Sequence, residues 1–199
     1  VWGPVPAMND VTHLCFFDIP VISNIPNMVY LAPTGKEEYR AMLEWGMRQN
    51  EHPVAIRVPA NGVVTTGEAV EEDYSVLNRY KVVEQGTKVA ILALGSFFQL
   101  GQSVVELLKQ QKGIDATLIN PRYITGIDEQ LLEELKADHQ LVVTLEDGVL
   151  DGGFGEKIAR YYGTSDMKVL NFGAKKEFVD RFDVQDFLYA NHLTTGQIA

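Results

Sequence analysis

The sequence predicts an α/β fold in two parts: a doubly wound domain with a mostly parallel sheet from about Tyr80 to the end, and part of a smaller α/β unit before it. First, apolar strand candidates alternate with helix candidates from Lys88 onward, which is typical of a parallel α/β sheet. Second, these strands are continuous apolar runs, as expected when helices cover both faces of the sheet. Third, turn formers and acidic residues replace hydrophobic periodicity over residues 61–79, which predicts a linker.

The first unit is predicted to contain two strands around one helix. Residues 27–32 form a short apolar run that is typical of a buried strand. Thr34 and Glu37 have the spacing of a capping box, so we expect a helix that continues to about Gln49. A second apolar run, residues 53–59, predicts another buried strand.

The second unit is predicted to contain strands and helices in alternation, followed by a final helix capped by Thr194 or Thr195. Asp128 is the expected N-cap of one of the alternating helices. The predicted strands are residues 88–95, 115–120, 140–146 and 168–172, and the predicted helices begin near Phe97, Asp128 and Gly155.

The composition excludes several classes of function. Twenty-seven acidic residues against 17 Lys and Arg residues give a formal charge of −10, so we expect neither a nucleic-acid surface nor a polybasic membrane patch. No apolar run approaches the roughly 20 residues that span a bilayer. Cys15 is the single cysteine, which excludes an intrachain disulfide framework and favours a reducing compartment such as the cytoplasm.

Two side chains stand out as candidates for chemistry in the first unit. Arg57 lies inside an apolar run, where a cation is costly to bury without an anionic partner. It can bind a phosphate or carboxylate ligand, pair with a structural carboxylate, or face solvent. His13 lies beside aromatic residues and suits proton transfer near neutral pH, although a lone histidine also serves structural roles.

Two further motifs lie in the second unit. Glu146 and Asp147 follow a strand at the sheet edge where α/β folds bind ligands, so they can hold a cation, transfer protons or cap the loop. Residues 152–155 form a glycine-rich turn before a helix, but the dinucleotide fingerprint is absent. A tight turn that packs the helix on the sheet is the favoured interpretation.

Several short stretches follow one another with a spacing that resembles the transketolase-like thiamine diphosphate enzymes, and the resemblance covers essentially the whole chain. The later stretches 144–147, 152–155 and 169–173 resemble the C-terminal domain of that family. The earlier ones are Thr12-His13, Phe17-Asp18, Ile25-Pro26-Asn27-Met28, Ala32-Pro33 and Arg57-Val58-Pro59.

The resemblance implies a domain organisation and a cofactor. Residues 1–60 would be the C-terminal part of a pyrimidine-binding domain, residues 61–79 a linker, and residues 80–199 the C-terminal domain. The chain would then be a piece of a longer cytoplasmic homodimeric enzyme that uses thiamine diphosphate and Mg²⁺. The family's diphosphate motif and catalytic Glu have no counterpart here, so we expect this piece to bind no cofactor and to be inactive alone.

The resemblance also implies roles for particular residues. His13 matches the active-site histidine, and Arg57 matches the arginine that binds the substrate phosphate. Asn9 and Asp10 occupy the place of an acid that contacts substrate, and Trp2 replaces a second phosphate-binding arginine. The implied substrates are pyruvate and glyceraldehyde 3-phosphate. The alternatives are a β-type subunit of a 2-oxoacid dehydrogenase and a non-catalytic dimerisation or scaffold module.

Overall fold

The computed structural model describes residues 2–3, 16–59, 62–180 and 182–199, with only the backbone of residues 2–3. We call the described residues up to Pro59 the N-terminal unit and those from Tyr80 to the end the C-terminal unit. Three predicted site residues, His13, Asn9 and Asp10, lie outside the described residues. Among the described helices, none combines the length and apolar character that crossing a bilayer requires.

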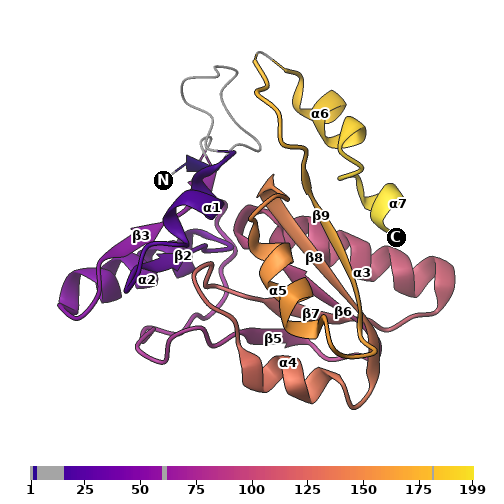
Figure 1. The fold of residues 1–199 in the computed structure, drawn as a ribbon, viewed down its shortest axis with the longest axis horizontal. Coiled ribbons are helices and arrows are strands. Elements are labelled where there is room, and N and C mark those ends of the chain that lie inside the picture. Colours follow the sequence, from indigo (N-terminus) through magenta and orange to yellow (C-terminus); the bar gives the residue numbers. More distant parts are fainter. Residues whose placement is uncertain (1, 4–15, 60–61, 181) are drawn as a thin grey trace.

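The C-terminal unit is built on a five-stranded sheet in the order β5-β7-β6-β8-β9. Four strands are parallel, and β5 pairs antiparallel with β7 at one edge. Helices lie on both faces of the sheet (Figure 1). The elements are β5 (Lys81–Glu84), β6 (Lys88–Ala93), η1 (Gly95–Phe97), α3 (Phe98–Lys112), β7 (Thr117–Asn120), α4 (Glu129–Leu135), β8 (His139–Val149), α5 (Phe154–Tyr162), β9 (Lys168–Ala174), α6 (Val184–Ala190) and α7 (Thr195–Ile198).

The strands direct alternate side chains into two separate cores. In β6, Ile91 and Ala93 pack in the core that includes α3 and the C-terminal helices, whereas Ala90 and Leu92 pack with α4 and α5. This alternation with a period of two is what a strand buried on both faces requires.

The N-terminal unit is a smaller α/β layer whose strands lie beside the large sheet. Its β2 and β3 pair in parallel, and β1 pairs in parallel with β4. On the other side of β2, Leu31 forms an antiparallel bridge with Tyr123, which lies beyond the end of β7. The elements are β1 (Trp2–Gly3), α1 (Asp18–Ile22), β2 (Val29–Leu31), α2 (Lys36–Arg48), β3 (Val54–Ile56) and β4 (Val58–Pro59).

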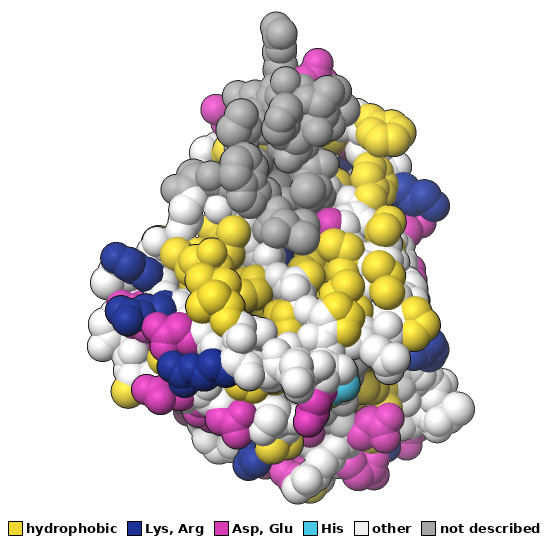
Figure 2. Space-filling model, turned by 90° about the vertical axis from the view of Figure 1, so that its left-hand side faces the viewer, with side chains coloured by type: hydrophobic (Ala, Val, Ile, Leu, Met, Phe, Trp, Pro, Cys, Tyr) yellow, Lys and Arg dark blue, Asp and Glu magenta, His cyan; other side chains and the backbone are white. Residues whose placement is uncertain are grey.

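Hydrophobic side chains gather on the face that carries the N-terminal unit (Figure 2). A hollow of about 490 Å³ lies there between α2 and the strands β3 and β4. Met47 and Leu43, one turn apart on α2, line this hollow and are both exposed.

The predicted α/β class with a mostly parallel sheet is confirmed. The structure differs from the predictions in local details, because β5 and α6 were not expected and the strand over residues 53–59 is divided at Arg57. The predicted capping box is also wrong. It is Glu38 that accepts the Thr34 amide at 2.9 Å, whereas Glu37 binds the amides of Thr66 and Gly67.

Candidate functional site

Arg57 lies between β3 and β4, and its side chain is buried with 5% of its surface exposed. Its Nε donates to Asp18 Oδ2 at 2.7 Å, and its Nη2 donates to Asp18 Oδ1 at 3.3 Å. Its Nη1 forms an ion pair with Asp147, whose side chain is 1% exposed. Of the alternatives that the sequence leaves for Arg57, pairing with structural carboxylates is therefore the one that the structure shows.

These partners come from distant elements. Asp18 is the first residue of α1, and Asp147 lies near the end of β8. The Tyr30 hydroxyl, on β2, donates to Asp18, and the Ser96 hydroxyl, just after β6, donates to Asp147 at 2.8 Å. We call Arg57, Asp18, Asp147, Tyr30 and Ser96 the Arg57 cluster.

The electrostatics of the cluster favour a fixed ionic state. Burial alone lowers the pKa of Arg57, but the charges of Asp147 and Asp18 outweigh burial and hold that pKa well above its usual value. Burial raises the pKa of Asp147, and Arg57 and Ser96 oppose this rise. Burial and the neighbouring Asp18 charge raise the pKa of Tyr30, so its hydroxyl remains a hydrogen-bond donor at neutral pH.

The cluster lies at the place where a parallel sheet usually receives a ligand. In the order β5-β7-β6-β8-β9, the chain leaves β6 first toward β7 and later returns to β8 on its other side. Ligands of open α/β sheets bind outside the carboxyl ends of the strands at such a switch point. Ser96 follows β6 and Asp147 lies near the end of β8, so the Arg57 guanidinium occupies this position.

Glu146, next to Asp147, has a different role. Its carboxylate is fully buried and accepts the backbone amides of Phe154 and Gly155, both at 2.8 Å, at the beginning of α5. Burial raises its pKa to about 8, although these two hydrogen bonds and the Arg57 charge oppose the rise. The two neighbouring acids singled out from the sequence therefore have different roles: Glu146 caps α5, and Asp147 pairs with Arg57.

The glycine-rich turn is a packing element. A Cβ on Gly155 would lie 2.5 Å from Thr144 Oγ1, and one on Gly153 would lie 2.5 Å from the Val149 carbonyl oxygen. Since the Glu146 carboxylate already accepts the amides at the start of α5, these amides are not available to a diphosphate.

Over the described ranges, no three or more His, Cys, Asp or Glu side chains come together as metal ligands. These residues therefore do not fit a magnesium diphosphate.

The described residues place both flanks of residues 4–15 close to the cluster. Gly3, before that segment, pairs with Pro59 two residues after Arg57. Phe16, after it, accepts the Val149 amide at 3.0 Å, and Asp18 binds Arg57.

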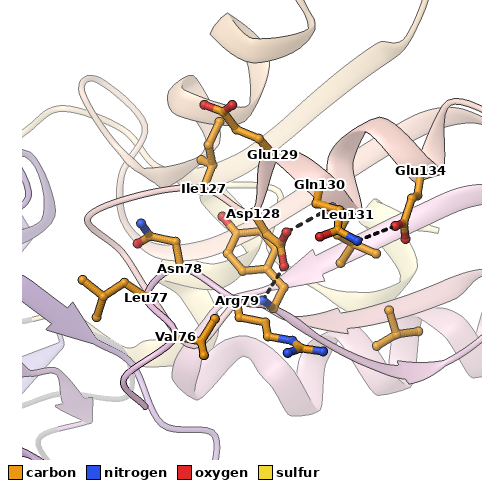
Figure 3. Close-up of a pocket in the computed structure, with 12 residues that line it drawn as sticks. Val76, Leu77, Asn78, Arg79, Ile127, Asp128, Glu129, Gln130, Leu131 and Glu134 are labelled. Atoms are coloured by element: carbon orange, nitrogen blue, oxygen red, sulfur yellow. Dashed lines mark hydrogen bonds between the residues drawn. The ribbon is translucent and has the colours of Figure 1, made fainter.

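A second hollow, of about 510 Å³, contains no member of the cluster (Figure 3). Asp128 lies in it and accepts the amides of Tyr80 at 2.8 Å and Leu131 at 3.0 Å. Its carboxylate is thus used as a helix cap, as predicted, and the exposed Val76 and Leu77 form part of the wall. We therefore centre the candidate site on the Arg57 cluster.

The sequence profile described as "Transketolase, C-terminal domain" matches residues 78–198. The chain belongs to this family. The resemblance stated from the sequence is thereby confirmed.

Curated relatives of this transketolase-family chain extend the similarity into the N-terminal unit. The 1-deoxy-D-xylulose-5-phosphate synthase of Clostridium tetani is 34% identical over 177 residues, which are 88% of this chain and 28% of that enzyme. The synthase of Pseudoalteromonas translucida is 36% identical over 170 residues, 84% of this chain and 26% of that enzyme. The chain thus spans little more than a quarter of these relatives.

Solved transketolases share the fold. A split-gene transketolase, described as an inactive beta4 tetramer, matches with a TM-score of 0.78 and 25% identity over 94% of this chain and 60% of that one. A mutant transketolase from Pichia stipitis matches with a TM-score of 0.74 and 13% identity over 100% of this chain and 28% of that one. The second likeness concerns the fold alone.

Proposed function

We propose that this chain is part of a thiamine diphosphate-dependent 1-deoxy-D-xylulose-5-phosphate synthase, which condenses pyruvate with glyceraldehyde 3-phosphate and releases carbon dioxide. The proposal rests on one observation, the 34% identity to a synthase over 88% of the chain, beyond the C-terminal domain alone. The product would serve isoprenoid precursor and thiamine biosynthesis.

The proposed site brings the predicted residues around the Arg57 cluster. His13 would orient substrate oxygens and move protons, and Asn9 and Asp10 would contact substrate. Arg57 would bind the substrate phosphate through its guanidinium, which suits a phosphate better than an ammonium does. A phosphate must then share this guanidinium with Asp18 and Asp147.

The cofactor and the partner belong to the proposal as well. Thiamine diphosphate, when bound, supplies the stabilised carbanion, and Mg²⁺ holds its diphosphate. Since the described residues do not fit that group, other parts of the parent protein would hold it. The expected assembly is a cytoplasmic homodimer. The split-gene transketolase, an inactive tetramer of beta chains, supports the expectation that this piece alone is inactive.

The test is to express the complete gene product and measure carbon dioxide release from pyruvate with added thiamine diphosphate and magnesium. Release that depends on glyceraldehyde 3-phosphate is the expected result. Co-purification of a separate cofactor-binding subunit, with no such dependence, would favour a 2-oxoacid dehydrogenase. No turnover and no binding of phosphosugar or cofactor in calorimetry would favour a scaffold module.

The phosphate role of Arg57 is tested separately with Arg57→Ala in the same complete protein. We expect KM for glyceraldehyde 3-phosphate to rise far more than KM for pyruvate. Arg40→Ala is the control, because Arg40 is an exposed arginine that pairs with Glu44 in the next turn of α2. Equal losses for both substrates would remove Arg57 from the phosphate role and leave it the centre of an ion-pair network.

A further inference from the structure

The crevice at the switch point of the C-terminal unit is filled from within the molecule. The Arg57 guanidinium comes from the N-terminal unit and reaches Asp147 at the end of β8. Two carboxylates from different units then share one cation, because Asp18 belongs to α1 and Asp147 to the sheet. The C-terminal unit thus binds a side chain where related folds bind a ligand.

The arrangement restricts the guanidinium on two sides. Nε and Nη2 face Asp18, whereas Nη1 faces Asp147, so the two carboxylates together fix the orientation of the guanidinium plane. Ser96 in turn holds Asp147 Oδ2 at 2.8 Å. Without Asp147, the guanidinium loses its ion pair with the sheet and keeps its contacts with Asp18 on α1.

The same contacts extend to α1. Asp18 begins this helix, whose turns are closed by the Val21 amide to the Phe17 carbonyl at 3.3 Å and the Ser23 amide to the Ile19 carbonyl at 3.0 Å. Five residues make a helix too short to be stable alone, so its position depends on such tertiary contacts. Fixing Arg57 from the sheet therefore also fixes α1.

We propose that Asp147 is a positioning residue, through which the C-terminal domain orients Arg57 and α1 for the reaction. The inference rests on the proposed function, and it adds a residue of the C-terminal domain to a site predicted from the N-terminal unit. Asp147 acts through Arg57 and contacts no substrate.

The experiment uses Asp147→Asn in the complete protein, with KM for each substrate and amide hydrogen exchange of α1 as readouts. Glu71→Gln is the control for the carboxylate-to-amide change itself, because Glu71 is an exposed partner of another buried arginine, Arg122. We expect Asp147→Asn to raise KM for glyceraldehyde 3-phosphate by about 10-fold or more, the cost of weakening one charge-assisted hydrogen bond. KM for pyruvate should change by less than about twofold, and the Val21 and Ser23 amides should exchange faster.

The outcomes separate this inference from the proposed function. A parallel loss for both substrates, or α1 exchange like that of Glu71→Gln, would overturn the positioning role while leaving the synthase activity intact. If the unmodified protein does not condense the two substrates, the proposed function fails, and exchange in α1 alone decides whether Asp147 fixes this helix. Ser96→Ala replaces Asp147→Asn if the latter does not fold, because it removes the hydroxyl that holds Asp147, and it should raise the same KM to a smaller extent.

Discussion

Replacing Arg57 with Met should destabilise the folded chain strongly, because two buried carboxylates lose a cation that they share. Their side chains are 5% and 1% exposed, so water cannot compensate them. Breaking a buried ion pair by removing one partner costs about 3–5 kcal/mol. We therefore expect a loss of about 4 kcal/mol or more at neutral pH, a large part of the roughly 5–15 kcal/mol that stabilises a typical protein.

The loss of unfolding free energy in Arg57→Met should be smaller at low pH than at high pH. Burial raises the pKa of Asp147, and the Arg57 charge opposes this rise, so without Arg57 the pKa of Asp147 in the folded state lies further above that in the unfolded chain. Stability from such groups is present at low pH and lost as pH rises through the folded pKa. The difference between Arg57→Met and the unmodified chain should accordingly shrink at pH 5 relative to pH 8.

Urea unfolding followed by the fluorescence of the buried Trp45 measures both effects. Arg40→Met is the control, because its exposed pair with Glu44 should leave the unfolding midpoint unchanged. A loss for Arg57→Met below about 1 kcal/mol, or one that grows on acidification, would refute the assignment of Arg57 as the compensating charge.

Three further predictions concern the packing and titration of the C-terminal unit. Gly101→Ala should cost about 1–3 kcal/mol in urea unfolding, since the new Cβ would lie 2.5 Å from that of Ala93; an unchanged midpoint would contradict the close contact. Asp128→Ala should cost about 1–2 kcal/mol, because it removes the cap of α4 and the acceptor of the Tyr80 amide, and Asp128→Asn should restore part of the loss. Burial raises the pKa of Glu146 from 4.5 to about 8, so folding stability should decline as pH rises through that window; a slope unaltered by Glu146→Gln would assign the decline to other groups.

The sequence predicts most of the large sheet because its signals are local and strong. The four parallel strands are continuous apolar runs, and each was found within a few residues of its position in the structure. The edge strand β5 was not predicted from the sequence because Lys81-Val82-Val83-Glu84 is only four residues long and half-exposed. The helix α6 was not predicted because it is only seven residues long; its N-cap is Asp183, whose side chain accepts the amides of Gln185 and Asp186.

The candidate site could be predicted only in part, since its contacts join residues that are far apart in the chain. Arg57 was singled out because a cation inside an apolar strand requires compensation, and the structure supplies it from 39 and 90 residues away. Neither spacing has a periodicity that identifies Asp18 or Asp147 as the partner. Asp147 was noted for its place at the end of a strand, but Tyr30 and Ser96 gave no chemical signal in the sequence.

The strand β2 has a further consequence for how the two units move. The Ala32 amide donates to the Arg122 carbonyl at 2.8 Å, and the Ile124 amide donates to the Tyr30 carbonyl at 2.7 Å. Residues that follow β7 thus extend the small sheet of the other unit. A hinge motion at residues 61–79 would have to break these main-chain hydrogen bonds as well as separate side chains. We therefore expect the two units to tumble in solution as one body. Cleavage of the peptide that connects them should leave the two pieces associated.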